Sequence, residues 1–234
     1  MSNTWALLPV KPPLQSKSRL SSILQPQECA ALSKAMLRDV INALELSSCI
    51  DRIAVLTCDT EVAELVSELG HSVIKDTVEN PGSASALCEG LQQATTFIAQ
   101  QGGDTVCIIP ADLPTISAQD IDALLHRHGN NAEPRVSLCP AIRDGGTNAL
   151  VCTPPDALTF EFGPDSANRH LQQADKQGLK AERAPMHAFF RDIDMPEDLL
   201  WLAQQDNCPN TLNYLRDSGL FARLDPALTL RASA

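Results

Sequence analysis

The chain alternates between apolar, strand-like runs and amphipathic, helix-like segments along most of its 234 residues. Residues 105–110 (TVCIIP) are apolar throughout, which is typical of a parallel strand covered on both faces. The first apolar run (WALLPV) is followed by a segment with apolar residues at helical spacing and then by a second strand-like run. Repeated strand–helix–strand units of this kind predict an α/β fold with a mostly parallel sheet.

The expected elements follow one another in regular order. Strands are expected at residues 5–10, 52–58, 71–75, 105–110, 135–142 and 147–152, with a last strand-like segment ending in RDID at 191–194. Helices are expected at residues 26–46, 61–69, 83–100, 117–126 and 166–176, and from 196 onward. No repeat or linker interrupts this order, so we expect a single domain over residues 1–234 with a helical tail from about 208.

The composition excludes some classes of protein. A formal net charge of -11 argues against a nucleic-acid surface, because phosphate backbones are bound by broad basic faces. No apolar stretch approaches the roughly 20 residues of a membrane span, and the first residues lack a signal-peptide pattern. We therefore expect a cytoplasmic protein with small-molecule substrates, no nucleic acid and no membrane as partners; a homodimer stays open. The eight cysteines lack Cys-x-x-Cys spacing and are expected to be reduced, mostly buried thiols.

Charged residues follow several of the expected strands. The proline-rich loop after the first strand carries Lys11, Lys17 and Arg19, whereas Asp112 and Asp194 follow the central and last strands. Ligands of open α/β sheets bind outside the carboxyl ends of the strands, where these side chains would meet. Carboxylates from separate strands can hold Mg²⁺, and lysine and arginine can neutralise phosphates. The pattern predicts metal-dependent phosphoryl chemistry, with Lys17 and Arg19 neutralising the phosphates.

Two glycine-containing loops predict small anion sites. Paired glycines precede Thr147 and Asn148, and such glycines let backbone N–H groups approach an anion while the two side chains add donors. Gly163 precedes Ser166 at an expected helix N-terminus, which also favours an anion. Both loops lie at ends of expected elements, where ligands are expected to bind.

A third segment is our candidate for contacts with a nucleotide. Residues 81–87 (PGSASAL) stand before a long helix, and Ser83 and Ser85 could contact a base and ribose, with Lys11 nearby on the first loop. An ordinary helix start would have the same composition.

Each of these features also has a simpler interpretation. An Asp after a strand can be a turn residue or a helix cap, and the three cations can be a solvated loop. The glycine pair can be a hairpin turn, and DMPEDL can be a plain helix start. Asp192 competes with Asp194 as the second metal ligand. His71 and His170 stand alone and are expected at the surface.

Taken together, the motifs resemble a known family. KSRL at 17–20, PADLP at 110–114, GGTNAL at 145–150, FGPDS at 162–166 with His170, and DIDMPEDL at 192–199 are similar to the guanylyltransferases of coenzyme F420 biosynthesis. That family includes versions named for 2-phospho-L-lactate, phosphoenolpyruvate and 3-phospho-D-glycerate. PADLP and DIDxPED occur widely among nucleotidyltransferases, whereas GGTNAL combined with FGP-Ser is more specific.

The resemblance implies a fold, a reaction and site residues. The fold would be a three-layer domain like that of nucleotide-diphospho-sugar transferases, similar to the GT-A and Rossmann folds. GTP would be the co-substrate and Mg²⁺ the cofactor, and GMP would pass to the phosphate of a three-carbon acid. Thr147, Gly163 and Ser166 would hold the acid, and Asp112 and Asp194 the metal.

The chain departs from the family pattern at two places. Asp165 stands where a small residue is common, and it could hydrogen-bond a hydroxyl of the acid. Pro12 and Pro13 stiffen the loop before Lys17.

Two other functions compete with this interpretation. The first is a different nucleotidyltransferase, using CTP or making a molybdenum-cofactor nucleotide, which should lack the GGTNAL and FGP-Ser pair. The second is a non-catalytic module that binds GTP without releasing pyrophosphate.

Overall fold

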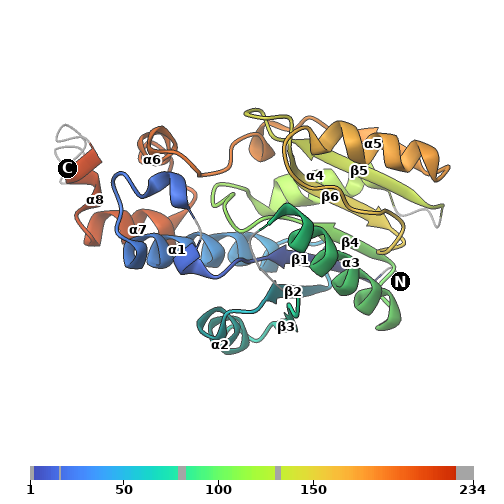
Figure 1. Cartoon of the computed structure of the whole chain (residues 1–234), viewed down its shortest axis with the longest axis horizontal. Helices are drawn as coiled ribbons and strands as arrows, with labels where there is room; N and C mark the ends of the chain where they lie inside the picture. The colour runs from blue at the N-terminus through green and yellow to red at the C-terminus, as the bar shows by residue number, and fades with distance from the viewer. Residues whose placement is uncertain (1–2, 16, 79–82, 130–132, 225–234) are drawn as a thin grey trace.

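A computed structural model describes residues 3–15, 17–78, 83–129 and 133–224 of the chain (Figure 1). Within these ranges the strands form a seven-stranded sheet in the order β3-β2-β1-β4-β6-β5-β7. The strands are β1 (Thr4–Pro9), β2 (Arg52–Thr57), β3 (Ser72–Lys75), β4 (Thr105–Ile108), β5 (Arg135–Pro140), β6 (Thr147–Thr153) and β7 (Lys180–Arg183).

The strand directions bring several loops to one edge of the sheet. β1 pairs in parallel with both β2 and β4, and β2 pairs in parallel with β3. β6 runs antiparallel to β4, with Ile108 opposite Leu150. The first residues of β6 therefore lie at the same edge as the last residues of β4. The predicted α/β class with a mostly parallel sheet is confirmed.

One expected strand is wrong. Residues 191–194 lie in a loop, and the last strand of the described part of the chain is β7, which pairs in parallel with β5 and ends at Arg183. Ala184 donates one more hydrogen bond to Leu138 O at 2.8 Å, but Pro185 follows and has no N–H to continue the ladder. The RDID segment is held instead by a hydrogen bond from Ile193 N–H to Asp112 O at 3.0 Å.

Helices cover both faces of the sheet. They are α1 (Pro26–Glu45), α2 (Thr60–Glu68), α3 (Ala84–Gln100), α4 (Ala118–His128), α5 (Ser166–Lys176), α6 (Pro196–Leu202), α7 (Pro209–Asp217) and α8 (Leu220–Leu224), with short 3-10 helices at Pro13–Gln15, Ser18–Leu20 and His187–Phe189. Ala6 and Leu8 of β1 share a buried core with α1, α2 and α4, whereas Trp5 and Leu7 share one with α3 and α5. This alternation produces three layers.

A third buried core joins the helices after residue 195 to the first half of α1 (Figure 1). Leu20 and Leu24, which follow the cationic loop, are buried in it together with Ile193. Asp39 of α1 accepts hydrogen bonds from the backbone N–H groups of Asn210 and Thr211, which fixes the start of α7. This core therefore anchors two of the segments that carry predicted site residues.

The remaining expectations concern the cysteines and membrane-spanning helices. All eight cysteines are free, and five of them are buried: Cys29, Cys107, Cys139, Cys152 and Cys208. Among the described helices, none combines the length and apolar character that a membrane crossing requires.

Candidate active site

Three carboxylates from two distant parts of the chain meet at the carboxyl edge of the sheet. Asp112 follows β4, and Asp192 and Asp194 lie in the loop before α6. Each offers a carboxylate oxygen within 4.8 Å of the others. The hydrogen bond from Ile193 N–H to the Asp112 carbonyl ties the two segments together, and the fully buried Ile193 side chain anchors the loop.

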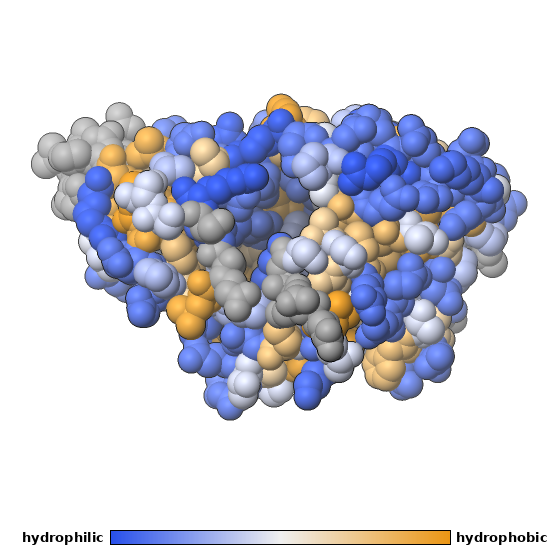
Figure 2. Space-filling view, viewed as in Figure 1, coloured by the Kyte–Doolittle hydropathy of each residue, from blue (hydrophilic) through white to orange (hydrophobic). Residues whose placement is uncertain are grey.

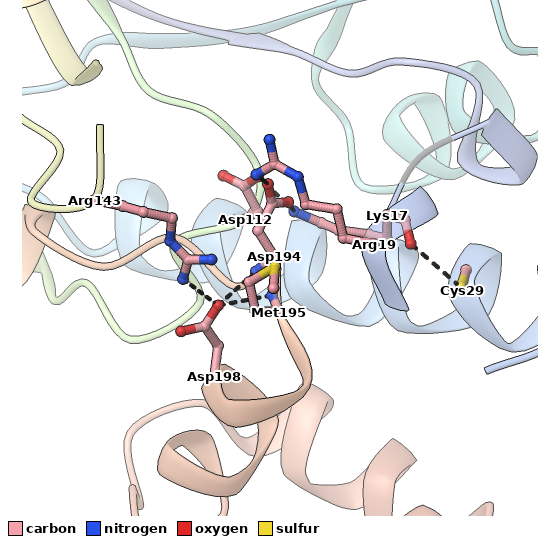
Figure 3. Close-up of polar contacts among 8 residues, drawn as sticks. All are labelled: Lys17, Arg19, Cys29, Asp112, Arg143, Asp194, Met195 and Asp198. Atoms are coloured by element: carbon pink, nitrogen blue, oxygen red, sulfur yellow. Dashed lines mark hydrogen bonds and ion pairs between the residues drawn. The ribbon is translucent and has the colours of Figure 1, made fainter. Parts of the chain in front are cut away.

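Lys17 links two of these carboxylates (Figure 3). Its Nζ lies 2.6 Å from Asp112 Oδ2 and 2.9 Å from Asp194 Oδ1, and only 7% of its side chain is exposed. Burial acts to lower the pKa of Lys17, but the charges of both carboxylates and the hydrogen bonds to them raise it above its ordinary value. The Lys17 amine is therefore protonated in the folded chain. Arg19 is 60% exposed and donates to Asp194 Oδ2 at 3.1 Å.

The cluster has the properties of a site for a divalent cation. Asp112 Oδ1 is buried and has no hydrogen-bond partner within the described part of the chain. Burial and the neighbouring charge of Asp112 raise the pKa of Asp192, so an additional positive charge would stabilise this carboxylate. Carboxylate oxygens are the ligands that Mg²⁺ prefers. The residues present therefore fit such an ion.

A buried carboxylate holds the loop that carries Asp194. Asp198, whose side chain is 2% exposed, accepts hydrogen bonds from the backbone N–H groups of Asp194 and Met195 at 3.0 and 2.8 Å. Arg143 donates to the same oxygen at 2.5 Å (Figure 3). Because Arg143 belongs to the loop between β5 and β6, this ion pair connects that loop to the carboxylate cluster.

The predicted acid-binding residues form a second buried cluster. Thr147 Oγ1 lies 3.0 Å from Ser166 Oγ and 3.1 Å from His170 Nδ1. Glu161 N–H donates to His170 Nε2 at 3.0 Å, so the ring proton is on Nδ1 and is donated to Thr147. Burial lowers the pKa of His170 to about 4, which keeps the ring neutral. The expectation of a surface histidine is wrong, because His170 is fully buried and its ring packs against Phe160 and Phe162.

Gly163 lies beside this cluster in a backbone conformation that favours glycine. Its φ is +121°, and a Cβ at this position would lie 3.8 Å from Ala84 Cβ in α3. Ala167 N–H donates to Gly145 O at 3.1 Å, which joins the two predicted glycine loops. The start of α3, the Gly163 loop and the β5–β6 loop are thus adjacent.

Two further residues near these loops have other partners. The Asn148 side chain is buried and donates to Phe189 O at 2.8 Å. Asp165 is exposed and accepts from Asn168 Nδ2 at 2.5 Å. In this structure neither side chain bonds to Thr147 or Ser166.

The predicted nucleotide-binding residues flank the start of α3. Ser83 is the N-cap of that helix and accepts from Ala86 N–H at 3.0 Å, and Ser85 is exposed in its first turn. Lys11 is exposed and lines a small pocket together with Ala86. Residues 81 and 82 of the candidate segment lie outside the described residues. Figure 2 shows the face in view hollowed near its centre.

Comparison with known proteins identifies the family. Residues 4–232 match the family model described as guanylyl transferase CofC like. The chain belongs to this family. As a CofC-like guanylyl transferase it is a nucleotidyltransferase, which confirms the resemblance seen in the sequence motifs and the expectation of an enzyme.

Several guanylyltransferases are similar to this CofC-like guanylyl transferase over most of its chain. The chain is 38% identical to a phosphoenolpyruvate guanylyltransferase of Roseiflexus sp. (86% of this chain, 85% of the relative). It is 33% identical to a 2-phospho-L-lactate guanylyltransferase of Methanothermobacter thermautotrophicus (91% and 90%) and 32% to a 3-phospho-D-glycerate guanylyltransferase of Phenylobacterium zucineum (91% and 95%).

A solved structure supports the fold. A crystal structure from Desulfovibrio desulfuricans, described as a nucleotide-diphospho-sugar transferase, matches with a TM-score of 0.73 at 18% identity over 95% of this chain and 98% of that one. The fold expected from the guanylyltransferase resemblance is confirmed.

The sequence did not single out the Arg143–Asp198 pair of this guanylyl transferase. Asp198 is the third residue of α6 and accepts from Met195 N–H, but methionine has no side-chain oxygen to complete the capping box that a sequence pattern would reveal. Its partner is 55 residues away in the chain, so only the fold brings the two together.

Proposed function

We propose that the chain transfers GMP from GTP to the phosphate of a three-carbon phosphorylated acid and releases pyrophosphate, in the biosynthesis of coenzyme F420. The observation that carries this proposal is the pairing of Lys17 with Asp112 and Asp194 at the same sheet edge as the Thr147–Ser166 cluster. The family match and the names of the relatives give the nucleotide and the class of acid.

The reaction needs positioning and charge neutralisation more than proton transfer. A phosphate oxygen of the acid attacks the α-phosphorus of GTP. The bond between the α-phosphorus and the oxygen that bridges it to the β-phosphate breaks, and this oxygen leaves with pyrophosphate. The attacking phosphate is already ionised at neutral pH, so no general base is required. Lys17 and Arg19 supply positive charge beside the carboxylates, where it reduces repulsion between the two anions and stabilises the leaving pyrophosphate.

Mg²⁺ is the proposed cofactor. Asp112 and Asp194 would hold it, and the buried, unpaired Oδ1 of Asp112 and the proximity of Asp192 favour this assignment. When bound, the ion supplies Lewis-acid stabilisation of phosphate oxygens. Asp198 and Arg143 hold the Asp194 backbone in place, so they act as positioning residues for this ligand.

The acid is proposed to bind at Thr147, Gly163 and Ser166. The neutral His170 donates to Thr147, which leaves the threonine hydroxyl proton available to Ser166 and fixes the direction of the chain of hydroxyls. Asn148 donates to Phe189 O, which orients the start of β6, and it is proposed to support the acid site in this way.

The nucleotide is proposed to extend toward Lys11, Ser83 and Ser85. A role for Asp165 in selecting the acid, and the cytoplasmic location, stay predictions.

Pyrophosphate release tests the proposal directly. The full chain is assayed with each of four nucleoside triphosphates, with and without Mg²⁺, against phosphoenolpyruvate, 2-phospho-L-lactate and 3-phospho-D-glycerate. We expect turnover with GTP and at least one acid, and only with the metal. Absence of turnover with GTP and every acid would disprove the proposed function.

Replacing Ser166 with alanine tests the acid site. The variant lacks one buried hydroxyl, and we expect the KM for the acid to rise about 10-fold, equivalent to one lost hydrogen bond, with the KM for GTP nearly unchanged. Ser67→Ala, at an exposed position of α2, is the matched control. Equal increases in both KM values would contradict the assignment of Ser166 to the acid.

A further inference from the structure

A small pocket lies at the carboxyl edge beside β1, β2 and β3, next to the cationic loop. It is lined by residues 9–12, Leu56, Ala86, Leu87 and Asp76. Most of these side chains are apolar, as suits the faces of a planar ring. Residues 9–12 begin the loop that leads to Lys17, so the pocket and the proposed triphosphate site are joined by one short segment of chain.

Asp76 places a fixed carboxylate at this pocket. Its backbone N–H donates to Thr57 O at 2.9 Å, and its Oδ1 accepts from Val78 N–H at 3.1 Å. Gly90 of α3 leaves room for the side chain, because a Cβ there would lie 3.1 Å from Asp76 Oδ1. The carboxylate has two oxygens and about four lone-pair sites, so the bond to Val78 leaves acceptor capacity for a ligand.

The chemistry of a carboxylate selects among nucleobases. Guanine presents two adjacent N–H donors, N1–H and the 2-amino group, and a carboxylate can accept from both. Adenine and cytosine present a donor next to an acceptor, and uracil presents one donor between two acceptors. An acceptor facing the carboxylate would lose its hydrogen bond to water without replacement, which is unfavourable in a partly buried site.

We propose that Asp76 recognises the guanine base by accepting hydrogen bonds from N1–H and the 2-amino group at the mouth of this pocket. This inference rests on the proposed use of GTP and adds the residue that sets nucleotide specificity. A role for the Asp76 side chain in binding also accounts for Gly90 of α3, the position at which α3 packs against Asp76.

Asp76→Asn tests the assignment by exchanging the base preference. Asparagine can still accept from Val78 N–H, but its amide places a donor where guanine also has a donor. Xanthine has a carbonyl oxygen in place of the 2-amino group, so it matches the amide. Binding of GTP and XTP to the full chain is measured by calorimetry without any acid. We expect the wild type to bind GTP more tightly than XTP and the variant to bind XTP more tightly than GTP. In each case the two Kd values should differ by up to about 100-fold.

The controls separate this inference from the proposed reaction. Asp175→Asn, at an exposed position of α5, should keep the wild-type ratio of GTP to XTP affinity. If Asp76 only stabilised the turn to Val78, both affinities would fall together with an unchanged ratio, and the inference would be overturned. It would also be overturned if the wild type bound both nucleotides equally. Turnover on the same samples reports on the proposed function independently of this binding ratio.

Discussion

Asp112→Asn is expected to lower kcat for GTP-dependent pyrophosphate release by about 10³-fold, a rate change equivalent to ~4 kcal/mol. The substitution keeps the shape of the side chain but removes the charge that would hold Mg²⁺. It also removes one of the two carboxylates bonded to Lys17. We expect the protein to stay folded, because Lys17 keeps its bond to Asp194 and the Asp112 carbonyl still accepts from Ile193. The measurement is steady-state kinetics over a range of Mg²⁺ concentrations, with circular dichroism as the check on folding.

The matched control for this variant is Asp104→Asn. Asp104 precedes the same strand, β4, at the opposite edge of the sheet, where its carboxylate accepts from Asn3 N–H at 2.8 Å. Its replacement should leave kcat unchanged. If the Asp112 variant retained wild-type kcat and the same dependence on Mg²⁺, Asp112 would not be a metal ligand.

The part of the fold that sequence could predict is the part fixed by short-range periodicity. Leu91, Ala94 and Ile98 of α3 recur at helical spacing and are all buried on one core, as their spacing indicates. The capping box of Ser117 and Asp120 likewise needs only a local pattern, and both of its hydrogen bonds are present. The RDID segment resembles a strand because charged residues flank the apolar Ile193. Its backbone pairs with no strand: Ile193 N–H donates to Asp112 O in the loop after β4, and Asp194 N–H donates to the Asp198 carboxylate.

The candidate site depended more strongly on long-range contacts. Strand ends could be expected to converge, and they bring Lys17, Asp112 and Asp194 into contact. The choice between Asp192 and Asp194 could not be made, because neighbouring residues in a loop do not reveal which oxygens meet; both belong to the cluster, and Asp194 is the one bonded to Lys17. His170 was misjudged for the same reason, since its buried environment comes from residues far from it in the sequence.

The cationic loop combines two roles that affect different measurements. In the structure described here the Lys17 ammonium neutralises Asp112 and Asp194, which are only about a quarter exposed. Removing the ammonium leaves these carboxylates and Asp192 repelling one another, which should destabilise the metal-free protein. The same ammonium competes with a bound cation for the two carboxylates. Stability and metal affinity should therefore change in opposite directions when Lys17 is replaced.

Lys17→Met is expected to show this opposition. The methionine preserves the length of the apolar stem, so the change is mainly the loss of charge. We expect unfolding free energy without metal to fall by ~2 kcal/mol, and kcat to fall about 100-fold because charge on the triphosphate is less well neutralised. Mg²⁺ should raise the Tm of the variant more than that of the wild type, measured by differential scanning calorimetry without nucleotide.

Lys34→Met is the matched control, because Lys34 pairs with Glu61 on the surface of α1 and α2, away from the carboxylate cluster. It should change neither kcat nor the response of Tm to Mg²⁺, since a solvent-screened surface ion pair contributes little to stability and none of its atoms lies in the cluster. An equal Mg²⁺-induced rise in Tm for wild type and Lys17→Met would mean that the ammonium and the metal do not share the same carboxylates. In that case a loss of kcat in the variant would have to come from contacts of Lys17 with the nucleotide alone. The calorimetric comparison thus separates a lysine that occupies the cation position from one that acts only on phosphate.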